Sequence, residues 1–457
     1  MNAFLDESYL LTTSESKRIY AEIKELPIVD AHNHADVAAI RQNASYTDLW
    51  QIEAASDHYV WELLRLRGVE EELITGDRAA HDKWLAAAEV WPELAGNPTY
   101  EWVHLDLKRL LDIDDEISAD TAEAIWDRAQ DRLAQPEMRP QQLLQTMGVE
   151  VMCSTDDPVD SLEDHQALAA DGAATRVRPT FRPDAAMNAF KPQWPAYIKK
   201  LEERTGTKCK HISDLIAALQ TCHDYFAEHG CRSSDHGVEV PYGYQVDEAD
   251  ADQAFRKARR REELSVDELV GFMAYVLNEV AEMDAEKGWT FQLHMGCVRD
   301  TREVLEQELG ADSGGDISDH MVPIVEPLVP FLNRFDQRLQ IVLYALDPNH
   351  QPTLTTLCRA FGQTVSLGSA WWLNDSPTGM KQQLEYIASV GLLANHAGMV
   401  SDSRKLLSYA SRHEMFRRCL ADVLGTMVNT GRVPEPVATK LAIHLACERP
   451  REVYNLA

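Results

Sequence analysis

Eight short apolar segments, each ending in polar side chains, recur along this chain with helical stretches between them. Strands that alternate with helices pair in parallel, and eight such units are the number that closes a (β/α)₈ barrel. We therefore predict an α/β chain with a (β/α)₈ TIM-like barrel and an active site at the carboxyl ends of its strands. The segments lie at 27–34, 149–157, 176–182, 231–236, 290–294, 340–346, 364–369 and 398–402.

Long helical stretches interrupt this pattern and set the expected organisation of the chain. Helical periodicity at 78–90 and 119–134 indicates an insertion after the first strand. Ser265 and Glu268 form a capping box that opens an amphipathic helix, which Gly288 closes. We expect an N-terminal segment with the first strand at 1–34, a helical insertion at 35–147, and the remainder of the barrel at 148–457 with a helical excursion at 185–229.

Composition and charge narrow the classes of partner. The 457 residues are 45% hydrophobic and carry a formal net charge of −30, which argues against nucleic acid or an anionic membrane surface. The eight cysteines show no CxxC spacing, and we predict reduced thiols in a cytoplasmic protein. The N-terminus lacks the basic and apolar regions of a signal peptide, and no apolar run approaches the roughly 20 residues of a membrane span, so we expect neither.

The first apolar segment ends in two histidines, His32 and His34, separated by one residue. Side chains alternate along a strand, so both imidazoles would point to one side and reach one metal ion. Two polar loop residues are the alternative explanation of this spacing. Asp402 follows the last segment, and two imidazoles with a carboxylate suit Zn²⁺, Mn²⁺ or Fe²⁺. We predict one divalent ion held by His32, His34 and Asp402, with Zn²⁺ the first expectation and Mn²⁺ or Fe²⁺ the alternatives.

Other chemically capable side chains follow the fourth and fifth segments and the last one. We expect Asp235, His236 and His294 to converge on the metal at the mouth of the barrel. Arg404 lies two residues after Asp402 and can clamp a carboxylate or neutralise a developing alkoxide. The ordinary alternatives are a core histidine for His294, a helix N-cap for Asp402 and a surface ion pair for Arg404.

Arginine and paired tryptophans stand at two further segment ends. Arg182 ends the third segment and, like Arg404, can bind an anion or form a surface ion pair. Trp371 and Trp372 follow the seventh segment, where flat aromatic faces suit the C–H faces of a sugar. Core packing is the alternative for this pair.

Together these segments resemble the uronate isomerase (glucuronate isomerase) family, a divergent branch of the amidohydrolase superfamily. The resemblance runs from Ile28 to Leu456 and rests on many motifs in order. They include Asp30-Ala31-His32-Asn33-His34, Asp57-His58-Tyr59, Thr155-Asp156-Asp157-Pro158, Phe181-Arg182-Pro183-Asp184, Ser233-Ser234-Asp235-His236-Gly237, Gln292-Leu293-His294-Met295-Gly296, Asp312-Ser313-Gly314-Gly315-Asp316, Trp371-Trp372 and Ser401-Asp402-Ser403-Arg404.

The resemblance implies a carbohydrate-metabolising barrel enzyme that interconverts D-glucuronate with D-fructuronate and D-galacturonate with D-tagaturonate. It places the metal on His32, His34 and Asp402, and holds His294 close to the site without making it a firm ligand. We also expect a homo-oligomer. Substrate contacts or assistance to proton transfer are implied for His58, Tyr59, Arg182, Asp235, Trp371, Trp372 and Arg404.

Aldose–ketose isomerisation needs a base near C2, an electrophile at O1 and O2, and a proton donor at oxygen. We predict Asp402 as the base and Tyr59 or His294 as the proton shuttle. Arg404 and the metal would stabilise the enediol. A metal-assisted hydride shift would use the same residues.

Two functions from other classes remain as alternatives. A metal-dependent amidohydrolase acting on an amide, ester or lactone would usually carry a sixth-strand histidine and a fourth-strand lysine. His350 lies well past the end of the sixth segment, which argues against hydrolysis. A non-catalytic sugar-binding protein would not need the Asp-Ser-Arg sequence beside a metal site.

Overall fold

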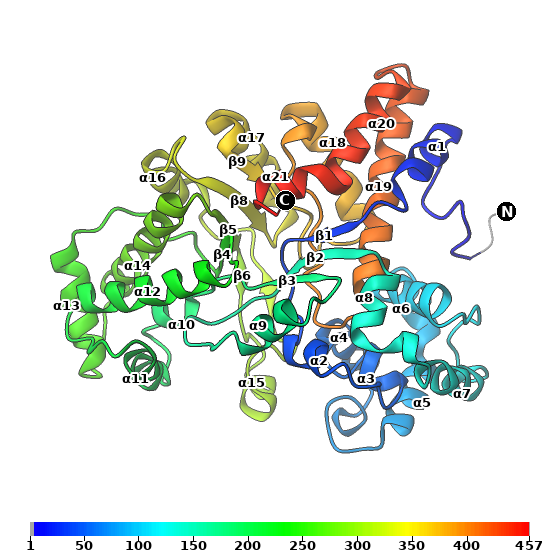
Figure 1. Cartoon of the computed structure of the whole chain (residues 1–457), viewed down its shortest axis with the longest axis horizontal. Helices are drawn as coiled ribbons and strands as arrows, with labels where there is room; N and C mark the ends of the chain where they lie inside the picture. Colours follow the sequence, from blue (N-terminus) through cyan, green and yellow to red (C-terminus); the bar gives the residue numbers. More distant parts are fainter. Residues whose placement is uncertain (1–3, 457) are drawn as a thin grey trace.

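Seven of the eight predicted strands are present in the computed structural model, which describes residues 4–456 (Figure 1). All of them pair in parallel, in the orders β1-β2-β3 and β4-β5-β8-β9. The fold is mixed α/β with parallel sheets, consistent with a TIM-barrel-like architecture. The strands are β1 (Ile28–Asp30), β2 (Val149–Cys153), β3 (Arg176–Arg178), β4 (Ser233–Val238), β5 (Thr290–Met295), β8 (Gln340–Ala345) and β9 (Val365–Leu367).

The eighth predicted strand, 398–402, is not a strand in the structure. Its residues Gly398 and Asp402 have φ of 92° and 50°, and left-handed backbone interrupts the extended repeat that a strand requires. Backbone hydrogen bonds nevertheless hold this segment between the end of β9 and the residues that follow β1. Ala397 N donates to Leu367 O at 2.9 Å, and Asp402 N donates to His32 O at 3.1 Å. Asp402 is thereby fixed beside the first histidine by backbone hydrogen bonds.

The first strand is also shorter than predicted. It ends at Asp30, so His32 and His34 lie in the segment that follows it. The Asp30 carboxylate accepts hydrogen bonds from Ser401 N at 2.6 Å and Ser401 Oγ at 2.7 Å. This buried contact joins the end of β1 to the segment that carries Asp402, and it aligns both groups of predicted metal ligands.

The helical insertion after β1 packs as a lobe with its own hydrophobic cluster, built around side chains such as Trp50, Trp84 and Trp91 (Figure 1, blue and cyan). The predicted helices at 78–90 and 119–134 are confirmed as α5 and α7. The helices of this region are α2 (Val37–Gln42), α3 (Leu49–Glu53), α4 (His58–Leu66), α5 (Ala80–Val90), α6 (Pro98–Leu110), α7 (Ala122–Leu133) and α8 (Pro140–Thr146), with the 3₁₀ turns Glu71–Leu73, Trp91–Leu94 and Pro136–Met138.

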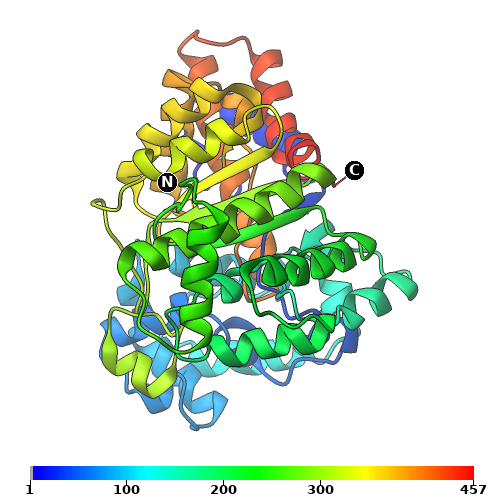
Figure 2. The same ribbon diagram turned by 90° about the vertical axis from the view of Figure 1, so that its left-hand side faces the viewer.

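Helices of the second excursion and their neighbours cover β4 and β5, and Figure 2 shows these green helices in front of the strands. The predicted capping box at Ser265 and Glu268 is present, and Gly288 ends the same helix with φ of 65°. These helices are α10 (Asp184–Met187), α11 (Trp194–Thr205), α12 (Ile212–Glu228), α13 (Glu248–Arg259) and α14 (Val266–Lys287), whereas α9 (Glu163–Ala170), between β2 and β3, packs on β3 and α2.

An excursion after β5 was not predicted. It contains the antiparallel pair β6 (Cys297–Val298) and β7 (Ile317–Ser318), with α15 (Glu303–Leu309) between them. Two-residue strands carry too few side chains to show alternation in a sequence. This β6–β7 excursion contributes a wall of the site described below.

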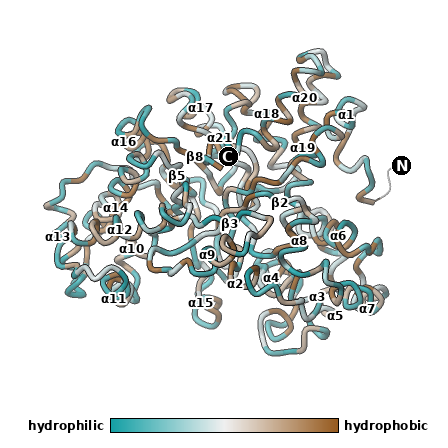
Figure 3. Tube along the Cα trace, in the orientation of Figure 1, coloured by the Kyte–Doolittle hydropathy of each residue, from teal (hydrophilic) through white to brown (hydrophobic). Residues whose placement is uncertain are grey.

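The remaining helices complete the molecule, and the hydropathy colouring shows apolar residues along the central strands and the inward parts of helices (Figure 3). The N-terminal α1 packs on α19, far away in sequence. These elements are α1 (Ser14–Ile23), α16 (Val325–Arg334), α17 (Gln351–Phe361), α18 (Pro377–Val390), α19 (Ser408–Asn429), α20 (Glu435–Ile443) and α21 (Arg449–Val453), with 3₁₀ turns Pro348–His350, Gly362–Thr364 and Leu393–Asn395 and a π-helical turn His444–Glu448.

The structure also bears on the predictions about membrane spans and disulfide bonds. Among residues 4–456, no helix is long and apolar enough to cross a membrane. All eight cysteines are buried and none forms a disulfide, as predicted from their spacing.

One packing detail lies directly under the site. The Tyr344 ring stacks on the His294 imidazole, with centroids 4.1 Å apart and planes 9° from parallel. Gly368 lies against the Tyr344 ring, and a Cβ atom at Gly368 would collide with that ring. Glycine is therefore required there by close approach.

Candidate active site

A cavity of about 850 Å³ opens at the carboxyl ends of the strands and collects most of the predicted site residues. Of the predicted residues, Tyr59, Asp235 and His236 do not line it. The cavity floor and walls include His32, His34, His58, Arg182, His294, Trp371, Trp372, Asp402 and Arg404, together with Arg299 and Asp312, which the sequence analysis did not assign.

The two histidines of the first segment meet Asp402. His32 Nε2 and His34 Nε2 each lie 3.1 Å from Asp402 Oδ1. Trp371 Nε1 donates to Asp402 Oδ2 at 2.8 Å, so both carboxylate oxygens are engaged. Burial would raise the pKa of Asp402, but the hydrogen bonds from His32 and His34 outweigh it and hold the pKa well below its usual range.

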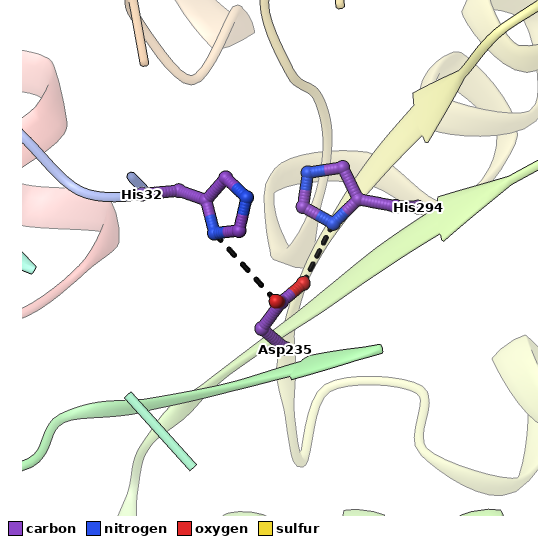
Figure 4. Close-up of side chains that lie close together, drawn as sticks. All are labelled: His32, Asp235 and His294. Atoms are coloured by element: carbon purple, nitrogen blue, oxygen red, sulfur yellow. Dashed lines mark hydrogen bonds and ion pairs between the residues drawn. The ribbon is translucent and has the colours of Figure 1, made fainter. Parts of the chain in front are cut away.

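A second group of donors shares His32, as Figure 4 shows. His294 Nδ1 lies 2.7 Å from Asp235 Oδ1, and His32 Nδ1 lies 3.6 Å from Asp235 Oδ2. Burial lowers the pKa of His294 to about 4, so its imidazole is neutral at pH 7. Within the described part of the chain, His294 Nε2 and His32 Nδ1 have no hydrogen-bond partner.

Each of these two groups holds two imidazoles and one carboxylate whose donor atoms lie within 4.8 Å of one another. That donor set fits Zn²⁺, Mn²⁺ or Fe²⁺. In the group with Asp235, His32 Nδ1 and His294 Nε2 have no hydrogen-bond partner among residues 4–456, whereas in the group with Asp402 both Nε2 atoms lie against Asp402 Oδ1, and a bound cation would replace those contacts.

Asp235 is fully buried and depends on cations for its charge. Arg182 Nη1 lies 3.4 Å from Asp235 Oδ2, and Arg182 Nε lies 3.0 Å from Asp184 Oδ2. Burial would raise the pKa of Asp235, yet Arg182, His32 and His294 hold it well below its usual range. Arg182 therefore lines the cavity with two carboxylate partners already in place.

His236 was expected to join this cluster, and that expectation is wrong. Its Nε2 lies 3.1 Å from Ser234 Oγ and its ring stacks on Phe291, with centroids 4.3 Å apart. Neighbouring residues of a strand point to opposite faces, so Asp235 and His236 cannot both face the cavity.

Tyr59 lies behind the cavity wall. Its hydroxyl donates to Asp375 Oδ2 at 2.9 Å, and Arg412 Nη1 donates to the same oxygen at 2.9 Å. Arg412 also donates to Ser401 O at 3.0 Å, next to Asp402. Burial raises the pKa of Tyr59 well above its usual value. No motif drew attention to Asp375 or Arg412, because a buried arginine within a helix has no sequence signature.

Aromatic rings form one side of the cavity. His58 stacks on Tyr59, with centroids 4.9 Å apart, and meets Trp372 edge-on at 5.3 Å. Trp371 lies against His294, with centroids 4.7 Å apart. The predicted aromatic residues are thus brought together at the site.

The β6–β7 excursion supplies two charged residues that sequence reasoning did not assign. Arg299 Nη1 lies 3.0 Å from Asp312 Oδ1 and 3.0 Å from Asp316 Oδ2. Arg404 Nη2 lies 3.6 Å from Asp312 Oδ2. Burial would raise the pKa of Asp312, but Arg299 and Arg404 lower it below its usual value. The motif at 312–316 was the available signal, although it did not reveal these partners.

A buried ion cluster fixes the chain just beyond Arg404. Lys405 Nζ lies 2.7 Å from Glu53 Oε2, 3.4 Å from Asp106 Oδ2 and 3.8 Å from Asp57 Oδ2. Asp57 caps α4 by accepting from Tyr59 N at 3.0 Å. Lys405 therefore ties the Asp402 segment to the start of the helix that carries His58 and Tyr59.

Comparison with known proteins places this geometry in a family. The glucuronate isomerase family model matches residues 1–450. A uronate isomerase of Thermotoga sp. (strain RQ2) is 48% identical over 451 residues, covering 99% of each chain. A uronate isomerase of Marinomonas sp. (strain MWYL1) is 38% identical over 450 residues, covering 96% of each chain.

Solved structures agree with this assignment. The uronate isomerase of Thermotoga maritima superposes with a TM-score of 0.97 at 48% identity, covering 99% of this chain and 100% of that one. The glucuronate isomerase of Caulobacter crescentus gives 0.95 at 26% identity, covering 99% and 97%. This chain belongs to the glucuronate isomerase family.

Proposed function

We propose that this protein is a uronate isomerase that interconverts D-glucuronate with D-fructuronate, D-galacturonate with D-tagaturonate, or both. The single observation that carries the proposal is the His32–His34–Asp402 cluster at the floor of a cavity that also holds arginines. A uronate needs both parts: a reacting end beside a base, and positive charge for its carboxylate.

We assign the metal site to His32, His34 and Asp402, with Zn²⁺ the first choice and Mn²⁺ or Fe²⁺ the alternatives. A bound divalent ion would supply Lewis-acid stabilisation of negative charge on the sugar oxygens. His294 belongs to the overlapping donor group with Asp235, and we assign it to the reaction and not to the metal.

The residues suggest a division of labour in the reaction. Asp402 removes the C2 proton of the open-chain sugar and returns it to C1. Arg404, whose guanidinium lines the cavity, neutralises charge on O1 and O2 as the enediol forms. Neutral His294 can pass a proton between these oxygens, because its Nε2 has no partner among residues 4–456. Tyr59 is the other shuttle, and its hydroxyl would have to leave Asp375 to reach the sugar.

Substrate binding completes the assignment. We assign the sugar to the aromatic side of the cavity and its charged groups to the arginine side. Asp235 contributes through Arg182 and His294, which it holds in place. The substrate-binding residues of this proposal are His58, Arg182, Asp235, Trp371, Trp372 and Arg404.

Hydrolysis of an amide, ester or lactone is the function this site supports less well. β4 contains no lysine, and β8 ends at Ala345, five residues before His350. His350 Nε2 lies 3.3 Å from His320 O, and His350 does not line the cavity. The residues expected to extend the ligand set of such hydrolases are therefore missing from their places.

The proposal extends to the setting of the enzyme. We propose that the two parallel sheets and the 398–402 segment close into a (β/α)₈ barrel, since the bridge Phe181↔Ser234 joins the chain beyond β3 to β4 of the second sheet. The helical insertion at 35–147 and the excursion at 185–229 are added to that barrel. We further propose a cytoplasmic homo-oligomer that acts on a small-molecule substrate.

The test is to incubate the purified protein with D-glucuronate and with D-galacturonate and to follow ketose formation. Formation of the matching ketose supports the isomerase. Running the reaction in D₂O separates the two chemical routes, because proton transfer admits solvent deuterium at C1 and a hydride shift does not. A protein that is saturated with Zn²⁺, Mn²⁺ or Fe²⁺ and forms no ketose from either uronate would refute the proposal.

A further inference from the structure

Asp312 lies between two arginines of the cavity and contacts each with a different oxygen. Its Oδ1 is 3.0 Å from Arg299 Nη1, a hydrogen-bond distance, and its Oδ2 is 3.6 Å from Arg404 Nη2. All three side chains line the cavity. One carboxylate therefore already fits at this place, and Arg299 is the residue that binds it directly.

Arg182, the other arginine expected at the site, is less available for a new anion. Its guanidinium lies on Asp184 and on fully buried Asp235. Removing the contact with Asp235 would leave a fully buried carboxylate with only histidines beside it, which is costly. A substrate carboxylate would gain more from an arginine whose partner can move into water.

Asp312 is such a partner. Its side chain is 48% exposed and its only described ion pairs are those with Arg299 and Arg404. Asp316, the second partner of Arg299, is 2% exposed and also accepts from Asp300 N at 2.7 Å. When Asp312 turns away, Asp316 keeps Arg299 in place.

We infer that Arg299 is the specificity-determining residue for the substrate carboxylate. Before substrate binds, the Asp312 carboxylate occupies the position of the substrate carboxylate on Arg299, and the substrate displaces it. The inference rests on the proposed function and adds a residue and an exchange of partners to it. Arg404 is left to act at O1 and O2, because its distance to Asp312 is longer than a hydrogen bond. A neutral sugar cannot replace the charge of Asp312, so the exchange selects uronates over hexoses.

The inference predicts opposite effects for the two partners. Arg299→Met should lower kcat/KM for D-glucuronate roughly ten- to a hundredfold, mainly through KM, because it removes a charge-assisted hydrogen bond. Asp312→Asn should lower KM for D-glucuronate, by roughly three- to tenfold, because the competing negative charge is gone. A folding defect does not lower KM, so the second variant protects the test against a misfolded first one.

The experiment measures both variants on D-glucuronate and on neutral D-glucuronamide, which differs only in replacing the carboxylate by an amide. Effects on the amide should stay within about threefold, because it carries no charge for Arg299 to bind. Arg302→Met is the matched control, since Arg302 is an exposed arginine of the same excursion and does not line the cavity. This control should behave as the wild type on both compounds.

Three outcomes would overturn the inference while leaving the isomerase intact. One is equal loss on glucuronate and glucuronamide in Arg299→Met. Another is a raised KM for glucuronate in Asp312→Asn, which would make Asp312 a support of the site. The third is a carboxylate-selective loss in Arg182→Met with none in Arg299→Met. Wild-type enzyme that isomerises neither compound would instead overturn the proposed function, and this inference with it.

Discussion

The floor and the rim of the cavity hold their charges in different ways. On the floor, His32 and Asp402 are nearly buried, and backbone hydrogen bonds from Asp402 to His32 and from His34 to Ser403 fix them. On the rim, Arg299 and Asp312 are 35% and 48% exposed and meet only through side chains. Buried and tightly bonded groups move little, whereas exposed ion pairs exchange partners with little change in free energy.

This difference separates the two tasks of the proposed enzyme. Proton transfer needs a base held at a fixed distance from carbon, and the floor supplies that rigidity. Recognition of a charged group needs partners that can be exchanged when the ligand arrives, and the rim supplies them. Substitutions on the floor should therefore act on kcat, and substitutions on the rim should act on KM or on selectivity.

The largest effect is expected at Asp402. Asp402→Asn keeps the size of the side chain and removes its basicity, and loss of a general base typically lowers the rate ~10²–10⁴-fold. We expect a fall of that size in kcat and loss of deuterium exchange at C2, measured with the metal-loaded variant. A variant that retains more than half of the wild-type kcat would rule out the base and weaken the distinction between floor and rim.

The next effect concerns metal content. His32→Ala and His34→Ala should each lower the affinity for the divalent metal, and activity should fall with it. The loss of affinity should exceed the roughly 10–100-fold typical of residues that only hydrogen-bond to a metal ligand. His32→Ala should also destabilise the fold more, because His32 faces both Asp402 and buried Asp235. Elemental analysis with thermal unfolding measures both. Full metal occupancy in both variants would remove these histidines from the metal site.

Arg404 tests where the boundary between floor and rim lies. If it acts at O1 and O2, Arg404→Met should lower kcat about ten- to a hundredfold on D-glucuronate and on D-glucuronamide alike. Arg404→Lys should recover only part, because a point charge lacks the planar fork of the guanidinium. Steady-state kinetics on both compounds are the measurement. A loss confined to KM for glucuronate would assign Arg404 to the rim.

The last effect is on stability and leaves catalysis aside, and it comes from a buried carboxylate outside the cavity. Asp156 accepts from Ser154 Oγ at 2.8 Å and Thr180 N at 3.2 Å, and with these neutral partners burial raises its pKa to about 7. The unfolded chain releases this proton near pH 4, so the stability that Asp156 contributes is complete below pH 4 and is lost as pH rises to about 7.

Asp156→Asn should abolish this pH dependence, because the amide cannot ionise. The free energy of unfolding of the variant minus that of the wild type should rise between pH 4 and pH 7 and stay constant above, by about 1.4 kcal/mol per unit of pKa shift at most. Urea unfolding across that range measures it. A difference that is constant with pH would mean that burial alone does not control the charge of carboxylates near this site.

Much of the fold was predictable because hydrophobic pattern carries it. The apolar segments that became β2, β5 and β8 have enough residues to show their character, and Gly288 and Ser265 mark the ends of α14 by local hydrogen bonding. The segment at 398–402 failed as a strand because its left-handed residues are set by tertiary contacts.

A motif predicted a residue at the site most reliably where it follows a strand end. His32, His34 and Asp402 come together as expected, although their role stays a prediction. Arg299 and Asp312 were missed because their meaning depends on how the β6–β7 excursion folds back over the cavity. Asp375 and Arg412, the partners of Tyr59, were missed for a similar reason. Arg412 lies near the start of α19, more than 30 residues after Asp375, and no local sequence pattern links residues that far apart.

Gly368 limits how this site can evolve. It does not line the cavity, yet any larger side chain there would press on Tyr344, and Tyr344 would pass the displacement to the flat-stacked His294. A random library at this position should return glycine almost alone among active clones. Attempts to widen the substrate range by enlarging the pocket will therefore fail at β5 and β8, where His294 and Tyr344 cannot move. Tolerated variation should instead accumulate in the β6–β7 excursion.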